Sequence, residues 1–275
     1  MKAARFDYHS PKDPKAAVQL LLEAGGRAKV IAGSQSLGPM LNLRLARPET
    51  VVDVSKLIEM RQVRLQGDRI VIGASVTHAE IEDGMYEPLL GHPLQEVAAS
   101  IAYRAVRNRG TLGGSLAHAD PAADWIVTLT ALDAQLQLLS PHQERTVRMR
   151  EFMHAAYTTA LTSEEIIVSV SVPRANGSKW GYYKFCRKPG EFAEASAAVW
   201  QPTTGGAITI VIGALDGAPM ELPELAQLIQ REGSAAANRE RIEQILRTAL
   251  PQRDAVDTRL HAVCVARALA KANLT

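Results

Sequence analysis

The chain is poor in cysteine, with only Cys186 and Cys264 among its 275 residues, and the two lie far apart. Two separated cysteines cannot build a disulfide framework, nor can they supply an iron–sulfur cluster or a cysteine-rich metal site on this chain alone. Long apolar runs are also missing, because no stretch approaches the ~20 residues of a membrane-spanning helix, and the N-terminus carries no apolar signal core. We therefore expect a cytoplasmic protein without a membrane span.

An excess of charge of one sign is absent as well. The sequence has 31 Lys and Arg against 29 Asp and Glu, a formal net charge of +2, and its basic residues are spread along the chain. This distribution does not indicate a nucleic-acid footprint, so nucleic acid is not an expected partner. No histidine has a partner at metal-ligand spacing, and no metal site is predicted. His78, just inside a predicted helix, is interpreted as a solvated surface histidine without a chemical role.

The length exceeds what one hydrophobic core usually organises, which favours two domains. The strongest linker signal is the segment 174–178, Arg-Ala-Asn-Gly-Ser. We therefore predict a first domain over residues 1–173 and a second over residues 174–275. Within the first domain a small α/β unit gives way to hairpins and helices, which predicts lobes over residues 1–57 and 58–173.

Glycine is concentrated in the segment 110–115, Gly-Thr-Leu-Gly-Gly-Ser, where three glycines fall within five residues. Such residues permit torsions and close approaches that a Cβ would block, so successive N–H groups can converge on an anion, with the hydroxyls of Thr111 and Ser115 as further donors. Asp120 and Pro121 are predicted to begin the next helix as its N-cap and first residue. The segment is interpreted as a phosphate-binding loop, although most such turns are only turns.

An earlier segment has the same character. Residues 29–32 predict a buried strand, residues 33–36 (Gly-Ser-Gln-Ser) a loop, and residues 37–43 a helix. The loop is neither a Walker loop nor a dinucleotide-binding G-x-G-x-x-G turn. Two such loops about eighty residues apart favour a ligand with two phosphates, held between two lobes. Positive charge at the mouth of the second loop, which favours an anionic ligand or a negative partner surface, comes from Arg104, Arg107 and Arg109.

The second domain is predicted to place strands before helices. This order is typical of an α+β domain, here a three-stranded sheet covered by helices. The expected strands are residues 180–186, 194–200 and 207–213, and the expected helices are residues 225–231, 235–250 and 258–272.

Several of these segments together resemble the FAD-binding medium subunit of the molybdenum hydroxylases, the family of the xanthine dehydrogenase flavin domain and the aerobic carbon monoxide dehydrogenase medium subunit. No single motif is specific, but jointly they are. The resemblance implies an α+β protein whose two-lobed FAD-binding fold of the PCMH/vanillyl-alcohol-oxidase type is followed by the C-terminal α+β domain. The motifs are residues 32–37 (Ala-Gly-Ser-Gln-Ser-Leu), 43–48 (Leu-Arg-Leu-Ala-Arg-Pro), 110–115, 120–124 (Asp-Pro-Ala-Ala-Asp) and 187–193.

The resemblance implies a non-covalent FAD whose pyrophosphate lies between the two loops and is held mainly by backbone N–H groups. It implies that Asp124, assisted by Asp120, accepts hydrogen bonds from flavin hydroxyls, that Ile101 packs near the adenine, and that Phe192 lies against the isoalloxazine. Lys184 is a further candidate, although a lysine in such a strand is more often solvated. The cofactor-binding residues expected on this basis are Val30, Ile31, Ala32, Gly33, Ser34, Gln35, Ser36, Leu37, Ile101, Thr111, Leu112, Gly113, Gly114, Ser115, Asp120, Asp124, Lys184 and Phe192.

Two positions depart from the family pattern. Ser34 stands where the family commonly has glycine, and Leu112 stands where it commonly has isoleucine. If residue 34 must adopt a positive φ, serine costs about 1 kcal/mol there, which a hydrogen bond from its hydroxyl to a phosphate would offset. Leu112 preserves side-chain volume and should be tolerated.

No side chain of this sequence is typical of a hydroxylation catalyst. The resemblance therefore implies an electron-transfer subunit of a heterotrimeric molybdenum hydroxylase, whose molybdopterin lies on a large partner subunit and whose [2Fe-2S] clusters lie on a small one. The FAD on this chain would then pass electrons to an external acceptor. A stand-alone FAD-dependent NAD(P)H oxidoreductase and a non-catalytic flavin-nucleotide-binding assembly module remain alternatives. The sequence leaves the substrate and the acceptor open.

Overall fold

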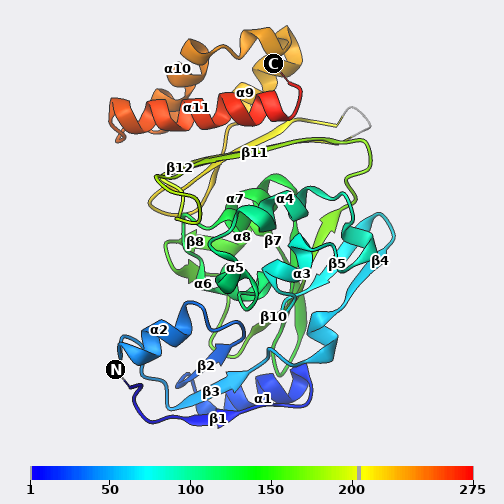
Figure 1. Cartoon of the computed structure of the whole chain (residues 1–275), viewed down its shortest axis with the longest axis vertical. Helices are drawn as coiled ribbons and strands as arrows, with labels where there is room; N and C mark the ends of the chain where they lie inside the picture. The colour runs from blue at the N-terminus through cyan, green and yellow to red at the C-terminus, as the bar shows by residue number, and fades with distance from the viewer. Residues whose placement is uncertain (1, 203–205, 275) are drawn as a thin grey trace.

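The computed structural model describes residues 2–202 and 206–274, and its elements form three tiers along the long axis of the molecule (Figure 1). The N-terminus lies in the bottom tier of this view, a sheet with its helices occupies the middle, and the C-terminal helices lie at the top. Helices and strands are mixed in a way that confirms the α+β fold class.

The bottom tier is a parallel sheet with the strand order β1-β3-β2. Helix α1 (Pro14–Ala24) has local signals at both ends, because the Asp13 carboxylate accepts the N–H of Ala16 and Gly25 ends the helix at a φ of 55°. The strand, loop and helix predicted over residues 29–43 are confirmed. The other elements of this tier are β1 (Asp7–His9), β2 (Ala28–Ile31), α2 (Leu37–Asn42) and β3 (Thr50–Asp53).

The middle tier is built on an antiparallel sheet with the strand order β4-β5-β10-β6-β7. Its strands are β4 (Val63–Gln66), β5 (Arg69–Gly73), β6 (Gln135–Leu139), β7 (Glu144–Arg148) and β10 (Ile166–Pro173), and a separate pair is formed by β8 (Met153–Ala155) and β9 (Thr158–Thr159). Its helices are α3 (His78–Glu82), α4 (Pro93–Ser100), α5 (Arg104–Arg107), α6 (Leu112–His118), α7 (Asp124–Ala131) and α8 (Met149–Phe152), with short 3-10 turns at Ile58–Arg61 and Glu87–Leu89.

One predicted helix start in this tier is wrong. Asp120 does not cap a helix that begins at Pro121, because its carboxylate accepts the N–H of Ala122 at 2.9 Å and closes a tight turn. Helix α7 begins only at Asp124. The glycine-rich segment, predicted as a loop, instead forms the beginning of α6, which Thr111 caps by accepting the N–H of Gly114.

The top tier is an antiparallel sheet with the order β11-β12-β13-β14, covered by helices. The three predicted strands are present, and a fourth, β14, was missed because a strand of two residues has no readable period. The helix expected from residue 235 begins later, because Asn238 caps it by accepting the N–H of Arg241. The elements are β11 (Lys179–Phe185), β12 (Ala195–Gln201), β13 (Thr209–Gly213), β14 (Met220–Glu221), α9 (Pro223–Glu232), a 3-10 turn (Ser234–Ala236), α10 (Arg239–Ala249) and α11 (Ala255–Lys271).

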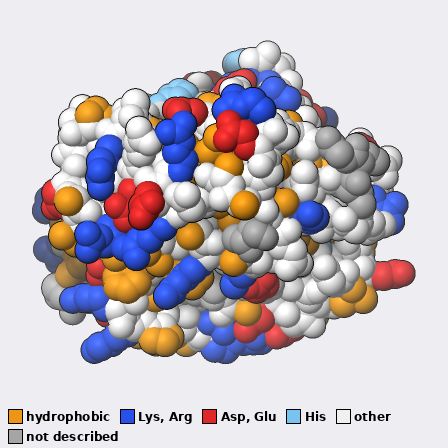
Figure 2. Space-filling view, turned by 90° about the horizontal axis from the view of Figure 1, so that it is seen from above, with side chains coloured by type: hydrophobic (Ala, Val, Ile, Leu, Met, Phe, Trp, Pro, Cys, Tyr) orange, Lys and Arg blue, Asp and Glu red, His pale blue; other side chains and the backbone are white. Residues whose placement is uncertain are grey.

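Strand β12 is buried on both faces and joins the top tier to the middle one. Ala197 and Val199 belong to the apolar cluster under the C-terminal helices, whereas Ala198 and Trp200 belong to the cluster of the middle tier. Successive residues of a strand point to opposite faces, so one strand serves both cores. The opposite, outward surface of the helices carries acidic and basic side chains interspersed with apolar ones (Figure 2).

Candidate functional site

The loop between β2 and α2 contains a run of backbone donors without protein acceptors. In the part of the chain that the structure describes, no acceptor pairs with the N–H groups of residues 33–37, although the neighbouring N–H of Gly38 donates to Ser34 at 3.2 Å. Ser34 has a φ of 63°, and Ser36 is right-handed helical. A left-handed residue within a run of unpaired amides is compatible with a concave anion site. The role of this loop in holding a phosphate stays a prediction.

Gly33 is a point of close approach between the bottom and middle tiers. A Cβ on this residue would lie 2.1 Å from the carbonyl oxygen of Arg109 and 2.7 Å from the Cα of Gly110. Only glycine permits this approach, because both neighbours are backbone atoms that cannot rotate away. The two predicted loops, far apart in sequence, are thus side by side.

Ser34 confirms the conditional expectation about its backbone. Its φ of 63° lies in the left-handed region, where serine costs about 1 kcal/mol relative to glycine. Its neighbourhood is tight, since a Cβ on Gly38 would meet the Ser34 hydroxyl oxygen at 2.5 Å.

The second predicted loop differs from the first, because its amides are largely used within the protein. Leu112 donates to Val76 at 3.0 Å, and Gly113 donates to Ala74 at 2.8 Å. The N–H of Ser115 donates to the carbonyl of Thr111. The expectation of a second amide cradle over residues 111–115 is therefore wrong for those backbone groups. The Ser115 hydroxyl, for which the described residues offer no partner, and the N–H of Thr111 remain as donors.

His78 packs behind this segment, and its interpretation as a solvated histidine is wrong. Its side chain is buried, its Nδ1 accepts the indole N–H of Trp125 at 3.1 Å, and its backbone N–H donates to Gly110 at 2.9 Å. Burial, and then the nearby charge of Arg107, lower the pKa of His78 to about 4. The ring is therefore neutral at physiological pH. It packs closely against Gly110, where a Cβ would meet the ring at 2.9 Å.

The buried histidines predict a loss of stability in mild acid. The unfolded chain takes up a proton at His78 near the ordinary pKa of 6.5, whereas the folded chain does so only near pH 4. The unfolding free energy should therefore fall as pH drops from about 6.5 to about 4, by at most about 3 kcal/mol for this group. Burial also lowers the pKa of His92 to about 4.

Urea titrations at about pH 7 and about pH 4.5 measure this effect. The variant His78→Gln, which keeps an acceptor for Trp125, should lose less stability between the two pH values than the wild type does. An equal loss in both proteins would contradict the assignment.

Asp124 and Lys184 meet in a buried polar cluster between the middle and top tiers. The Lys184 ammonium lies 2.8 Å from Asp124 Oδ1 and donates to the carbonyl of Ser100 at 2.8 Å. The same Asp124 oxygen accepts the hydroxyls of Tyr182 at 2.7 Å and Ser100 at 3.2 Å. Burial, then the charge of Asp124, raise the pKa of Tyr182 well above its usual range, so its hydroxyl stays a donor. The second carboxylate oxygen has no donor among the described residues, and it is not one of their fully buried unpaired atoms.

Lys184 is therefore not the solvated lysine that its position in a strand favoured. Sequence reasoning also missed Ser100 and Tyr182, which complete the cluster. Strand alternation places Tyr182 and Lys184 on the same face of β11, and this was the available signal.

The loop between β11 and β12 carries Phe192, which is 62% exposed. The loop lies against the segment that follows Ile101, because a Cβ on Gly190 would meet the ring of Tyr103 at 2.8 Å. Phe192 lines a shallow hollow of about 470 Å³ together with Arg187 and the residues 190–194. Ile101 itself is half-buried at the end of α4. The structure thus brings Asp124 and Lys184 together beside Ser100, the residue that precedes Ile101. The Phe192 loop lies next to Tyr103, two residues after Ile101.

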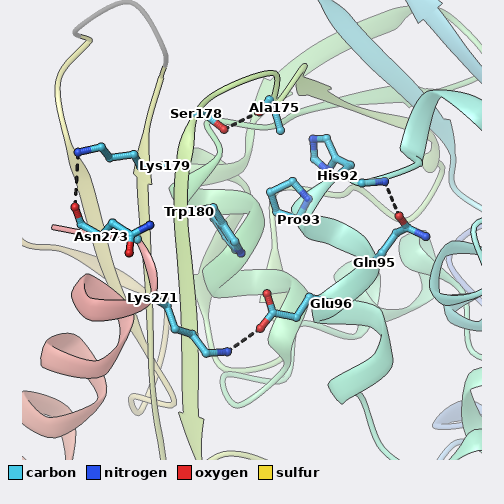
Figure 3. Close-up of a pocket in the computed structure, with 12 residues that line it drawn as sticks. His92, Pro93, Gln95, Glu96, Ala175, Ser178, Lys179, Trp180, Lys271 and Asn273 are labelled. Carbon is cyan, nitrogen blue, oxygen red and sulfur yellow. Dashed lines mark hydrogen bonds and ion pairs between the residues drawn. The ribbon is translucent and has the colours of Figure 1, made fainter.

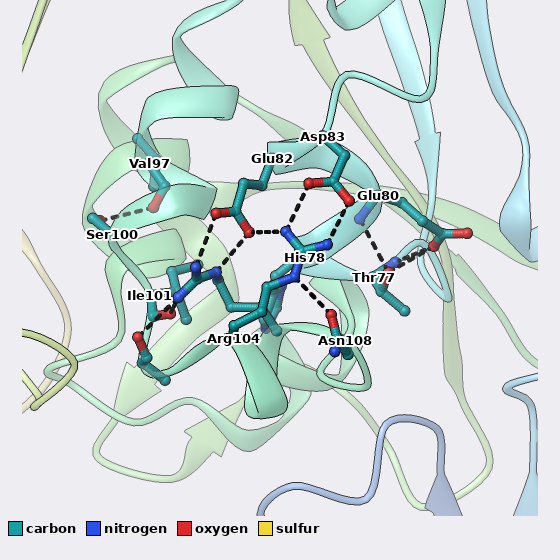
Figure 4. Close-up of polar contacts among 12 residues, drawn as sticks. Thr77, His78, Glu80, Glu82, Asp83, Val97, Ser100, Ile101, Arg104 and Asn108 are labelled. Carbon is teal, nitrogen blue, oxygen red and sulfur yellow. Dashed lines mark hydrogen bonds and ion pairs between the residues drawn. The ribbon is translucent and has the colours of Figure 1, made fainter.

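Two of the three arginines expected to attract an anion are neutralised. Arg104 pairs with Asp83 and Glu82 (Figure 4). Arg107 pairs with Glu82. For those two residues the expected role at the mouth of the second loop is wrong. Arg109 is exposed, and no partner for its guanidinium occurs among the described residues.

A second hollow lies away from these residues, at the other end of α4. It measures about 480 Å³ and is lined by His92, Glu96, Trp180 and Lys271 among others (Figure 3). The Glu96 carboxylate pairs there with Lys271, and none of the predicted cofactor-binding residues lines the hollow.

Comparison with known proteins decides the family. Residues 4–175 match the family described as the FAD binding domain in molybdopterin dehydrogenase. The chain belongs to this family. It is 38% identical over 206 residues to the carbon monoxide dehydrogenase medium chain of Hydrogenophaga pseudoflava, covering 74% of this chain and 72% of that protein. It is 37% identical over 222 residues to the nicotine 6-hydroxylase medium subunit of Paenarthrobacter nicotinovorans, covering 79% and 76%.

Solved structures resemble this chain over 99% of its length. Carbon monoxide dehydrogenase from Hydrogenophaga pseudoflava, in a form lacking the Mo-pyranopterin moiety, superposes with a TM-score of 0.86 at 32% identity, covering 99% of this chain and 98% of that one. Quinoline 2-oxidoreductase from Pseudomonas putida 86 superposes with a TM-score of 0.87 at 29% identity, covering 99% and 98%. The protein is therefore an FAD-binding oxidoreductase subunit, as the sequence motifs predict.

Two negative findings hold for the described residues 2–202 and 206–274. No group of three His, Cys, Asp or Glu side chains there is placed to hold a metal ion. No helix in this part of the molecule has the length and apolar character required to cross a bilayer.

Proposed function

We propose that this chain is the electron-transfer subunit of a molybdenum hydroxylase, assembled with a large molybdopterin-binding subunit and a small iron–sulfur subunit. The names of its relatives support an assembly, since they are medium chains or medium subunits of carbon monoxide dehydrogenase and nicotine 6-hydroxylase. The division at residue 173 and the cytoplasmic location remain predictions from the sequence.

The residues present fit FAD. The observation that carries the assignment is the run of unpaired amides at residues 33–37. It lies beside the close backbone approach of Gly33 to residues 109 and 110, where a Cβ on residue 33 would collide. We assign these amides, with the Ser115 hydroxyl and the Thr111 N–H, to the pyrophosphate. The remaining predicted residues of the β2–α2 segment, Val30, Ile31 and Ala32, would line it.

The polar cluster at the top of the site is assigned to the flavin half. The unpaired oxygen of Asp124 can accept a hydroxyl, and Lys184 retains a third N–H after its two bonds. Asp120 is bound to Ala122 and to the Tyr157 hydroxyl, so it supports the turn between α6 and α7. Phe192 is assigned to the face of the isoalloxazine.

When bound, FAD would supply the exchange between one-electron and two-electron transfer. The chain's own groups bind the cofactor, orient it and neutralise the diphosphate charge. None of them is assigned to the oxidation of the substrate, which therefore belongs to a partner.

Titration of the purified chain with FAD, followed by flavin fluorescence, tests the proposal. We expect saturable binding of one FAD per chain. A folded sample that binds neither FAD nor ADP would refute it.

Two further measurements, recovery of partner subunits and reduction of the flavin by NADH, distinguish the proposed subunit from a stand-alone oxidoreductase and from an assembly module. Co-expression with a tag on this chain should recover two partner subunits that contain molybdenum and iron. Rapid bleaching of the flavin by NADH in the isolated chain, with no recovered partners, would favour the stand-alone oxidoreductase. FAD binding with neither partners nor reduction would favour an assembly module.

A further inference from the structure

Arg107 makes more contacts than an ion pair requires. Its guanidinium donates to both carboxylate oxygens of Glu82, at 2.7 and 2.9 Å. Its Nη1 donates to the carbonyls of Ile101 and Ala102, each at 3.0 Å. The side chain is only 12% exposed. Four bonds to a planar, buried guanidinium fix its position far better than a surface pair would.

These bonds close a strained turn. Ala102 has a φ of 43°, a left-handed conformation that is unfavourable for a residue with a Cβ. The carbonyls on either side of this strained residue both point at one donor, Arg107. Glu82 holds that donor, and the hydrogen bond from Arg107 is the main cause of the lowered pKa of Glu82. The carboxylate therefore stays charged across the neutral range.

The turn sets the path of the segment 101–111. From Arg107 onward, Gly110 donates to Val106 at 2.7 Å, and its carbonyl accepts from His78. The carbonyl of Arg109 is the atom that lies against Gly33. Movement of Arg107 would thus displace Ile101 at one end and the edge of the amide run at the other.

Arg104 provides a natural comparison on the same short helix. Its side chain is 47% exposed and pairs with Asp83 and Glu82, but it donates to no backbone carbonyl among the described residues. It carries the same charge next to the same acid without closing the turn.

We propose that Arg107, held by Glu82, is a positioning residue for the pyrophosphate of the cofactor, which FAD and ADP share. It fixes the backbone of residues 109–111 without touching the ligand. This inference rests on the proposed FAD site. On this proposal, the ion pair between Arg107 and Glu82 fixes the backbone geometry of the site and does not attract the ligand by its charge.

The test compares Arg107→Met, Arg107→Lys and Arg104→Met by calorimetric titration of the whole chain with FAD and with ADP. We expect Arg107→Met to lower the affinity for FAD and the affinity for ADP by the same factor, on the order of tenfold to a hundredfold. Arg107→Lys keeps the charge but not the fork geometry, so it should recover only part of the affinity. Arg104→Met should change the affinity for either ligand by no more than about twofold.

A double variant separates positioning from general stability. In Arg107→Met the Glu82 carboxylate keeps only Arg104 as a partner, so the double variant Arg107→Met/Glu82→Gln should regain part of the lost unfolding midpoint. ADP affinity should stay low, because the carbonyls of the turn remain unpaired. Amide exchange over residues 101–111 should be faster in both variants.

Three results would overturn the inference: unchanged ADP affinity in Arg107→Met, an equal loss in Arg104→Met, or recovery of ADP affinity in the double variant. Each presupposes a wild type that binds FAD and ADP. A wild type that binds neither ligand refutes the proposed function itself, so the two failures are distinguishable.

Discussion

Gly33→Val is expected to abolish FAD binding by the folded chain. The new Cβ would lie 2.1 Å from the Arg109 carbonyl oxygen and 2.7 Å from the Cα of Gly110, so the bottom and middle tiers must separate locally. The unpaired amides of residues 33–37 belong to the segment that moves. We expect FAD affinity to fall by at least about a hundredfold, and the unfolding free energy to fall by about 2 kcal/mol or more.

Fluorescence titration with FAD and urea unfolding measure the two effects separately. The matched control is Gly217→Ala, whose Cβ would have an ordinary contact of 3.8 Å with Ala155. If Gly33→Val bound FAD with the affinity of the wild type, the amides of residues 33–37 would not belong to the binding site. An equal loss of affinity in the control would show that the effect is not local.

Lys184→Met is expected to destabilise the chain by about 3 kcal/mol, because it leaves the Asp124 carboxylate in a buried position without its cation. Asp124 is 6% exposed, so water cannot replace the ammonium fully. The hydroxyls of Ser100 and Tyr182 still donate to it, which limits the loss. The same change removes a donor from the flavin half of the proposed site, so FAD affinity should fall as well.

The control for burial is Lys271→Met, which breaks the exposed pair with Glu96 and should cost less than about 1 kcal/mol. The double variant Lys184→Met/Asp124→Asn should regain part of the stability, because it removes the unpaired charge. Urea unfolding of the four proteins gives the values. A loss in Lys184→Met no larger than in Lys271→Met would contradict the buried ion pair.

The sequence was most informative where the signal is local. The order of strand, small-residue loop and helix over residues 29–43 is readable from neighbouring residues, and the structure confirms it. The caps at Asp13 and Thr77 are local in the same sense, since their side chains accept from amides three residues away. The division into α+β layers follows from the alternation of such local patterns.

It was misleading where a partner lies far along the chain. The expected anion-binding role of Arg104 and Arg107 ignored Glu82 and Asp83, which belong to α3 and meet them only after folding. His78 looks like a solvated residue at a helix start, but Trp125 and Gly110 bury it. The glycines at 110 and 113 suggested free amides, whereas their role is to allow close packing.

By itself, the sequence determined the family, the FAD-binding chemistry and the position of the first amide-rich loop, because motifs and local hydrogen bonds depend on residues close together in the chain. Tertiary structure alone decided which amides stay unpaired, that Asp124 and Lys184 share a buried cluster, and that two arginines serve the scaffold. Those outcomes depend on which distant groups reach hydrogen-bonding distance, and a buried charge or donor takes the partner that folding brings to it.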